Sequence, residues 1–519
     1  MALFLLLLVP SGFLAWRYRN MPQFGLHHDD AIYWVSAKSL AEGQGYRIQS
    51  MPAQPHQSKY PPAYPALLAG VWLLNPLFPQ NLPLAALLSW LLFPAYLLLA
   101  RQVFRDYGFG FAATSFLCLS IALNAMSLML ALSLMSDLFF CVGLLAVLGL
   151  AERGTDQALP WWCYLLLGIL AGFTYLIRSV AAPLLVSVPL CFWLAKRRAG
   201  AVLFLTGMLP AMAGWQLWAK LHQSGNDLFS LYYTDYLGFY LKNVHPSEIP
   251  AMLQLNAAEY WRGIGQLLLF NVDDSFFARI LAGVTAIAAV SGLIRLLQTS
   301  RRLHYAVYGV GLSLMLLTWH YAPSARFLFP LFPLLAAGLF TELRHVWHLV
   351  LMNARKPKSA DRIAAYAIAV VLFCYGATWA NLTWGGIRLL PTLMEDRVRL
   401  LRDTAPVYSW VREHTLPSDT FLAYDDAVLY LETGRRGLTE PIVGRLLFAE
   451  DEAGKRRYVE ALPAAARDAG LTHLLLTNVD FYRDLHERGS KALREAADSL
   501  PFLRLEYSDA HNRVYKILR

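Results

Sequence analysis

A run of apolar residues at 109–130 carries no charged side chain. A helix rises about 1.5 Å per residue, so about 20 such residues cross a hydrocarbon core of about 30 Å. Comparable runs recur along most of the chain. Charged residues make up 16% of the sequence, whereas a soluble domain usually carries about 25%. The sequence therefore predicts an α-helical bundle that crosses a membrane several times.

Apolar runs with charged or aromatic ends predict about eleven transmembrane helices. They lie near 2–17, 84–100, 109–129, 133–151, 161–177, 180–195, 201–220, 276–298, 304–320, 326–343 and 363–383. The run 65–78 is a further candidate. Its shortness and the prolines Pro65, Pro76 and Pro79 favour an interfacial or re-entrant helix instead.

Short basic clusters, among them Arg101, Arg105, Arg153 and 196–198, lie beside alternate apolar runs. Because loops rich in Lys and Arg face the cytoplasm, this pattern places the N-terminus inside and the C-terminus outside. Much of the net charge of +9 lies in such clusters, so anionic membrane lipids explain it better than a nucleic acid does. We expect a multi-pass protein of a bacterial inner membrane with no nucleic-acid partner.

In this topology the long polar segments all face the outside. They are the first outer loop, 18–83, the second, 221–275, and the tail, 384–519. The tail is charged and contains strand-like stretches at 473–479 and 513–518, as in a small α/β domain. We expect residues 1–383 to form a transmembrane catalytic module and the tail to form an extracytoplasmic α/β domain.

The first outer loop contains an acidic pair, Asp29 and Asp30, at the start of a stretch with helical spacing that Gly43 ends. One aspartate is well explained as the cap of this helix. Two adjacent carboxylates repel each other when water is excluded, which leaves one of them able to take up a proton. A structural and a catalytic role are therefore both open. His27 and His28 precede the pair and, with Asp29, form a candidate site for a divalent metal ion.

Lys59 lies in the segment KYPP (59–62) of the same loop. The prolines restrict the backbone to an extended form, so the ammonium group is held on a stiff segment. Lysine is a compact cation that binds phosphate. The alternative explanation is ordinary placement of a lysine at the membrane interface.

Further ionisable side chains lie near the outer ends of predicted spans. Asp137 lies just inside an apolar run, where burial costs about 2.5–3.5 kcal/mol on insertion scales, so it is either functional or a helix cap. Arg178 lies in an outer turn, against the usual bias of positive charge, which suggests an anionic partner. His320, Tyr321 and Arg326 lie on the same side, where they are site candidates or interface anchors.

Other features of the sequence narrow the classes of function. A second acidic pair, Asp273 and Asp274, precedes the eighth predicted span, where helix capping explains it. A third pair, Asp425 and Asp426, lies in the tail, where a solvated turn is the simplest explanation. The sequence contains no P-loop, Rossmann glycine pattern, H-E-x-x-H or G-x-S-x-G motif. ATP-driven transport by a Walker site and the ordinary hydrolase classes are therefore excluded.

Four segments together resemble the GT-C superfamily of membrane glycosyltransferases, in the branch of aminoarabinose transferase and the protein O-mannosyltransferases. DDAIY (29–33) is similar to that branch's D-E-x-x-Y, and KYPP (59–62) to its K-P-P-L. SLMSDLFF (133–140) places a carboxylate near the start of the fourth span, and RFLFPLFPLL (326–335) is similar to R-Y-x-x-P-x-x-P. The chain departs from the pattern in having Asp30 in place of glutamate and Tyr60 before the prolines.

The resemblance implies a GT-C-like bundle that transfers a sugar from a polyprenyl-phosphate donor to a lipid, glycan or protein acceptor outside the membrane. Asp29 would be the general base and the sugar carbon would be inverted, although the choice between Asp29 and Asp30 stays open. Lys59, with Arg178 or Arg326, would bind the donor phosphate, whose leaving charge must be stabilised. Asp137 would orient the acceptor or support the base. The other candidates for the site are His28, Tyr33, Tyr60, His320 and Tyr321.

Two other classes of function compete with the enzyme. A transporter or flippase of an envelope lipid also needs buried charges in a helical bundle, but such proteins tend to be built from repeated halves, which this sequence does not show. A non-catalytic scaffold would leave Asp29 and Asp30 simply solvated.

Overall fold

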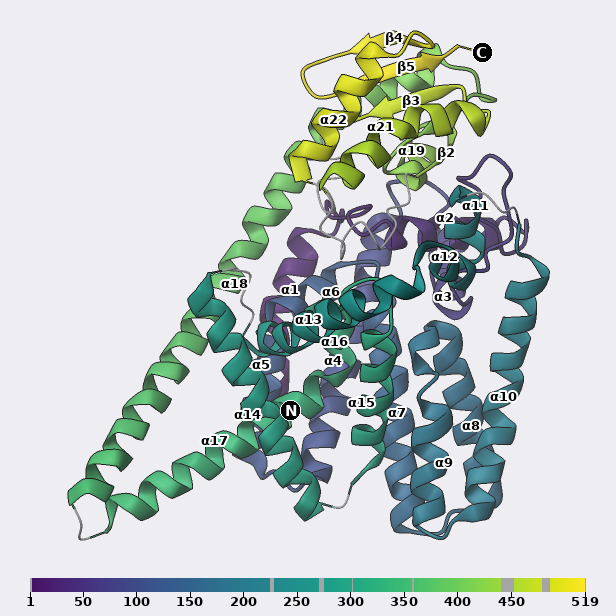
Figure 1. The fold of residues 1–519 in the computed structure, drawn as a ribbon. Coiled ribbons are helices and arrows are strands. Elements are labelled where there is room, and N and C mark those ends of the chain that lie inside the picture. Colours follow the sequence, from purple (N-terminus) through teal and green to yellow (C-terminus); the bar gives the residue numbers. More distant parts are fainter. Residues whose placement is uncertain are drawn as a thin grey trace.

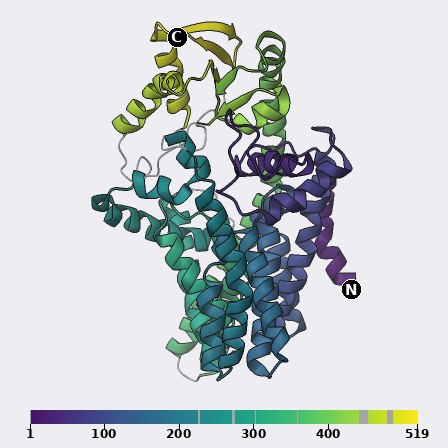
Figure 2. The same cartoon turned by 90° about the vertical axis from the view of Figure 1, so that its right-hand side faces the viewer.

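The computed structural model describes residues 2–224, 228–269, 275–300, 302–356, 359–439, 452–477 and 486–518. A bundle of helices forms one half of the protein, and a small domain that contains all the described strands lies over one end of it (Figure 1). The view turned by 90° shows the same two layers (Figure 2). The basic residues 196–198 lie where α9 (Leu184–Leu194) turns into α10 (Arg198–Leu221), at the far end of the bundle from this domain (Figure 1).

Six of the described helices are long and apolar enough to cross a membrane. They are α4 (Leu82–Asp106), α7 (Asp137–Asp156), α10 (Arg198–Leu221), α14 (Phe276–Ser300), α16 with α17 (Ala325–Ala354) and α18 (Ser359–His414). Four more predicted spans coincide with the shorter helices α1 (Ala2–Arg17), α8 (Trp161–Ile177), α9 (Leu184–Leu194) and α15 (His304–Leu317). The multi-pass bundle is thus confirmed, while the number of eleven crossings stays a prediction.

The run predicted as one span at 109–129 is broken in the structure. It forms α5 (Phe111–Ala122) and α6 (Ala125–Leu132), which meet at an angle of 58°. Asn124 lies at the break, where its side chain accepts hydrogen bonds from the backbone N–H groups of Met126 and Ser127 and donates one to the carbonyl of Leu267. The mean hydropathy of the run does not reveal this break, because the residue that caps α6 is a single asparagine in an otherwise apolar run.

The fourth predicted span starts later than its hydropathy suggests. Ser133 has an extended backbone, and α7 begins only at Asp137. Asp137 therefore lies at the first turn of the helix rather than inside it. A carboxylate there is favoured by the partial positive charge of the helix N-terminus.

Glycines allow some helices of the bundle to pack backbone against backbone. A Cβ atom at Gly292 of α14 would overlap the carbonyl oxygen of Gly338 in α17. Gly168 of α8 and Gly207 of α10 approach in the same way. Small residues at such crossings are the usual means of association between helices in membranes, where apolar burial alone gives no preference for protein over lipid.

The described parts of the polar segments predicted to face outward lie on the side of the small domain and include several helices (Figure 1). The first outer loop contains α2 (Asp29–Ala41) and α3 (Ala63–Leu74). The second contains α11 (Leu228–Thr234), α12 (Tyr236–Asn243) and α13 (Ile249–Leu269). The run 65–78 is therefore helical over most of its length, with α3 packing on α2 and on α8.

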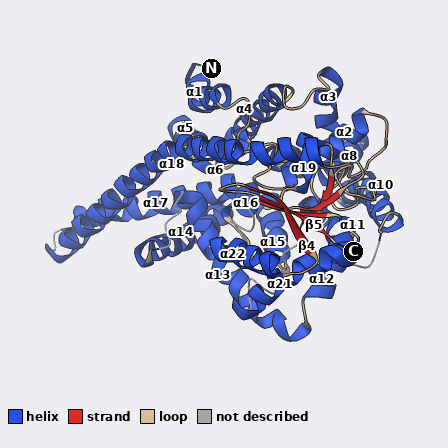
Figure 3. Cartoon of the chain, turned by 90° about the horizontal axis from the view of Figure 1, so that it is seen from above, coloured by secondary structure: helices blue, strands red, loops and turns tan. Residues whose placement is uncertain are grey.

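The C-terminal domain is a sheet of strand order β2-β1-β3-β5-β4 with helices beside it. Its elements are β1 (Thr420–Leu422), α19 (Asp426–Thr433), β2 (Arg436–Leu438), α21 (Glu452–Asp468), β3 (His473–Leu476), α22 (His486–Ser499), β4 (Leu503–Ser508) and β5 (Arg513–Ile517). Strands β2, β1 and β3 are parallel, and β5 and β4 continue the sheet antiparallel. Seen from above, the sheet lies over the bundle (Figure 3). The predicted strand–helix mixture in the tail is confirmed.

The boundary predicted at residue 383 falls inside α18, which runs unbroken from Ser359 to His414 into the C-terminal domain. The composition changes from apolar to charged along this helix, and the helix continues through Pro391 and Pro406. The membrane module and the domain are therefore joined by a continuous helix rather than by a flexible linker (Figure 1).

Candidate active site

A cavity of about 460 Å³ lies where the bundle meets the C-terminal domain. Its walls come from the first and second outer loops, the end of α8 and the turn after it, the end of α15 with the segment that follows and α16, and two loops of the domain. The residues with ionisable side chains in these walls are His27, His28, Asp29, Tyr33, Lys59, Tyr60, Arg178, Tyr232, Tyr321, Tyr424 and Asp425. Most of the site residues proposed from the sequence thus line this one cavity.

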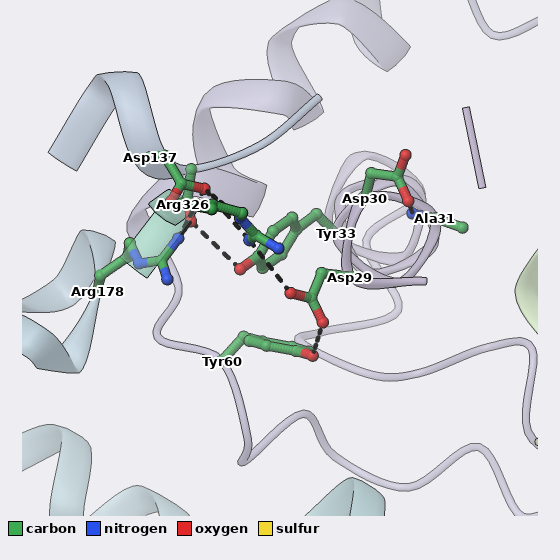
Figure 4. A network of polar contacts seen from close by, with 9 residues as sticks. Asp29, Asp30, Ala31, Tyr33, Tyr60, Asp137, Arg178 and Arg326 are labelled. Atoms are coloured by element: carbon green, nitrogen blue, oxygen red, sulfur yellow. Dashed lines mark hydrogen bonds and ion pairs between the residues drawn. The ribbon is translucent and has the colours of Figure 1, made fainter. Parts of the chain in front are cut away.

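Asp29 is the first residue of α2, and its carboxylate faces this cavity. Tyr60 donates a hydrogen bond of 2.5 Å to Oδ1. Arg326 Nη2 lies 3.4 Å from Oδ2 (Figure 4). Although burial disfavours its charge, the positive charges of Arg326 and Lys59 and the hydrogen bond from Tyr60 lower the pKa of Asp29 to about 2. Asp29 is therefore ionised and held in one orientation.

Asp30 points away from Tyr60 and Arg326 and is not part of the cavity wall (Figure 4). Its carboxylate is buried and accepts hydrogen bonds from the backbone N–H groups of Gly25 (3.0 Å) and Ala31 (2.9 Å). Burial and the neighbouring Asp29 raise the pKa of Asp30 to about 6. Asp30 therefore has a structural role at the start of α2, whereas the neighbouring Asp29 lines the cavity.

Asp137 connects Arg178, which lines the cavity, with Arg326, which lies behind the cavity wall. Its Oδ2 lies 2.8 Å from Arg178 Nη1 and 3.2 Å from Arg326 Nη2, and its side chain is almost fully buried. Ser136 extends this network, because its hydroxyl accepts a hydrogen bond from Arg178 and lies 3.2 Å from the Tyr33 hydroxyl. The network joins α7, the end of α8 and α16, and it fixes the guanidinium that contacts Asp29.

Lys59 lies in the cavity wall with its ammonium group against two aromatic rings. Nζ is 3.6 Å from the ring centroid of Tyr232 and 5.2 Å from that of Tyr60. Burial lowers the pKa of Lys59 to about 8, while the negative charges of Asp29 and Asp426 oppose this shift. Most of the ammonium group is therefore still protonated at neutral pH, and a bound anion would raise its pKa again.

The two arginines proposed for anion binding differ in position. Arg178 lines the cavity, whereas Arg326 lies behind the wall between Asp29 and Asp137.

His320 also lies outside the cavity wall and is buried, with its ring stacked on Tyr240 at a centroid distance of 4.9 Å. Burial lowers the pKa of His320 to about 3. Its ring belongs to an aromatic cluster with Tyr240 and Trp319. Its neighbour Tyr321 lines the cavity.

The metal site raised for His27, His28 and Asp29 is not formed. Within the described ranges, no three His, Cys, Asp or Glu side chains lie close enough together to hold a metal ion. The ring of His28 is directed instead to the C-terminal domain, where Nε2 lies 2.9 Å from Asp426 Oδ1.

Sequence reasoning missed the contribution of the C-terminal domain. Tyr424 and Asp425 follow strand β1 and Thr439 follows β2, and all three line the cavity. Ligands of open α/β sheets bind beyond the carboxyl ends of parallel strands. The position of these three residues directly after strand segments was therefore the sequence feature that could have identified them. Asp426 is buried rather than in a solvated turn, which corrects the expectation for the third acidic pair. The second pair, Asp273 and Asp274, lies outside the residues that the structure describes.

No protein-family model and no curated protein sequence matches this chain, but solved structures do. ArnT from Cupriavidus metallidurans bound to undecaprenyl phosphate matches at 13% identity over 97% of each chain, with a TM-score of 0.52. An oligosaccharyltransferase from Archaeoglobus fulgidus in complex with Zn and sulfate matches at 11% identity, with a TM-score of 0.50 over 94% of this chain and 69% of that chain. Both proteins are GT-C glycosyltransferases. The chain therefore has the fold of the GT-C membrane glycosyltransferases.

Proposed function

We propose that the protein is an inverting glycosyltransferase that moves a sugar from a polyprenyl-phosphate donor to an acceptor on the extracytoplasmic side of the membrane. The observation that carries this proposal is that an ionised carboxylate, Asp29, and a half-buried cation, Lys59, line the same cavity at the end of the bundle opposite the basic turn 196–198. A lipid-linked donor can approach such a cavity from the bilayer, and a polar acceptor can approach it from water.

In the proposed reaction, the acceptor hydroxyl oxygen attacks the anomeric carbon of the sugar while Asp29 takes the hydroxyl proton. The bond from the sugar to the phosphate oxygen breaks, and the electron pair leaves with the polyprenyl phosphate. A phosphate leaving group needs no general acid, so one carboxylate is sufficient. Attack from the side opposite the leaving group inverts the sugar carbon.

Lys59 and Arg178 are the proposed phosphate-binding cations, because both line the cavity. Their charges would stabilise the negative charge that develops on the leaving oxygen in a site of low dielectric. A phosphate bound to Lys59 would also reduce the attraction of this cation for Asp29. The pKa of Asp29 would then rise from about 2 and the carboxylate would become a better base.

Arg326 and Asp137 are proposed to position Asp29 rather than to bind substrate. The fold of ArnT, which was crystallised with undecaprenyl phosphate, supports a polyprenyl-phosphate carrier. The acceptor is proposed to be a lipid, a glycan or a protein. The sugar–phosphate bond supplies the free energy, so the reaction needs no nucleotide.

The test is incubation of the purified protein in lipid with labelled polyprenyl-phosphate sugars and mass analysis of candidate acceptors. We expect a new glycosidic bond and free polyprenyl phosphate with the wild type, and neither with Asp29→Asn. Movement of a labelled lipid across vesicles without a new bond would overturn the proposal in favour of a flippase. Equal activity of wild type and variant would remove Asp29 from the chemistry.

A further inference from the structure

The C-terminal domain contacts the first outer loop through α19, the helix that follows the cavity-lining residue Asp425. Asp426 is the first residue of α19, and its side chain is fully buried. Its Oδ1 lies 2.9 Å from His28 Nε2 and accepts a hydrogen bond of 2.9 Å from the Tyr233 hydroxyl. One carboxylate oxygen thus joins the domain to both outer loops of the membrane module.

This contact favours the charged form of the His28 imidazole. Burial alone would favour neutral imidazole, but the hydrogen bond and the negative charge of Asp426 raise the pKa of His28. Lys59 opposes and Asp29 supports this shift. The second oxygen of Asp426 is buried and has no hydrogen-bond partner among the residues that the structure describes. A buried carboxylate is costly without a partner, so its stabilisation depends on Oδ1 and hence on His28 and Tyr233.

His28 is the residue directly before Asp29. Its φ is +57°, a backbone conformation that side chains other than glycine rarely adopt, and its ring does not cap α2. Such conformations persist only where surrounding contacts hold them. Here the ring is directed away from the helix and towards Asp426.

A second contact lies a few residues upstream in the same loop. A Cβ atom at Gly25 would lie 2.6 Å from Val428 Cγ2 of α19, and the Gly25 N–H donates to the Asp30 carboxylate. Further along, Tyr430 of α19 donates a hydrogen bond to Gln49. The helix α19 therefore touches the loop both before and after the acidic pair.

From these contacts we propose that Asp426 is a positioning residue that, through His28, holds Asp29 at the start of α2 in its place in the cavity wall. The proposal rests on the function proposed above and deepens it. The C-terminal domain is then a working part of the active site, supplying Tyr424 and Asp425 to the cavity and fixing the catalytic carboxylate from outside the membrane.

The experiment compares Asp426→Asn with Asp498→Asn. Asp498 lies in the same domain and also accepts from a cation, Arg513 (2.5 Å), and from a tyrosine hydroxyl, Tyr515 (2.6 Å), but both are partners within the domain. The first readout is amide hydrogen exchange over residues 25–32, which needs no substrate. We expect exchange there to be at least tenfold faster in Asp426→Asn and unchanged in Asp498→Asn.

The second readout is steady-state transfer. Because a small misplacement of a catalytic group can cost on the order of a hundredfold in rate, we expect kcat of Asp426→Asn to fall between about tenfold and a hundredfold, with KM for the donor unchanged. Asp498→Asn should keep kcat within about twofold of the wild type.

In a double-mutant cycle, Asp426→Asn should add little to the loss caused by His28→Asn, because both remove the same contact. If Asp426→Asn does not fold, Tyr233→Phe carries the test, with smaller changes in the same direction.

Unchanged exchange over residues 25–32 together with unchanged kcat would overturn the positioning role and leave the proposed function intact. Independent, additive losses in the double-mutant cycle would also overturn it. If the wild type transfers no sugar from any polyprenyl-phosphate donor, the proposed function fails instead, and the hydrogen-exchange comparison still decides whether Asp426 holds the loop.

Discussion

Arg326 Nη2 lies 3.4 Å from Asp29 Oδ2, although 297 residues separate the two in the sequence. The same nitrogen lies 3.2 Å from Asp137 Oδ2. One guanidinium therefore holds the cavity-lining carboxylate and is itself held by a second, buried carboxylate. This arrangement gives the two aspartates different roles and leads to separate predictions for each.

Asp29→Asn should abolish sugar transfer, with kcat lower by about 10²–10⁴, because general base catalysis contributes a factor of this size. Binding of polyprenyl phosphate should remain within a few fold of the wild type, measured by calorimetry in detergent. Asp30→Asn is the matched control, since its side chain is outside the cavity wall. A larger loss of kcat in Asp30→Asn than in Asp29→Asn would reverse the assignment.

Lys59 should make donor binding depend on pH. Its pKa is about 8, so the ammonium form that attracts phosphate dominates below this pH and is lost above it. Affinity for polyprenyl phosphate should therefore fall as pH rises through 8. Lys59→Arg should bind with little change over the same range, because guanidinium stays charged. Calorimetric titrations between pH 6 and pH 9.5 check this, and identical pH profiles for the two proteins would contradict it.

Asp137→Asn should destabilise the protein strongly. It leaves the buried charges of Arg178 and Arg326 with less compensation, and removal of one partner from a buried ion pair costs about 3–5 kcal/mol. Glu395→Gln breaks the exposed pair with Arg17 and should cost at most about 1 kcal/mol. Thermal unfolding in the same detergent gives both values. Similar shifts in Tm for the two variants would show that the buried network is not a main source of stability.

Asn124→Ala tests the break between α5 and α6. The variant loses the cap of α6 and the hydrogen bond to Leu267, and loss of a cap alone costs about 0.5–2 kcal/mol. Asn124→Asp keeps the capping oxygen but removes the donor, so it should recover part of the loss. Thermal unfolding measures the order, which we expect to be wild type, then Asp, then Ala.

The sequence alone determined the helical membrane bundle, the α/β character of the tail and the GT-C fold. These properties depend on local patterns, because the hydropathy of a run sets whether it enters a bilayer and short motifs in a fixed order carry the resemblance to GT-C glycosyltransferases. It also placed Asp29 and Lys59 in one loop. Local patterns could not show the break at Asn124, because it depends on one polar residue in an apolar run. They also could not show the continuity of α18, because the composition changes from apolar to charged within this one helix.

Only the tertiary structure decided which side chains meet. It separated Arg178 in the cavity wall from Arg326 behind it, and Asp29 in the wall from the buried Asp30. It brought Asp426 to His28 across 398 residues. Such contacts depend on how distant elements pack on one another, and the free energy of burying a charge is set by partners that its own neighbours in the sequence do not reveal.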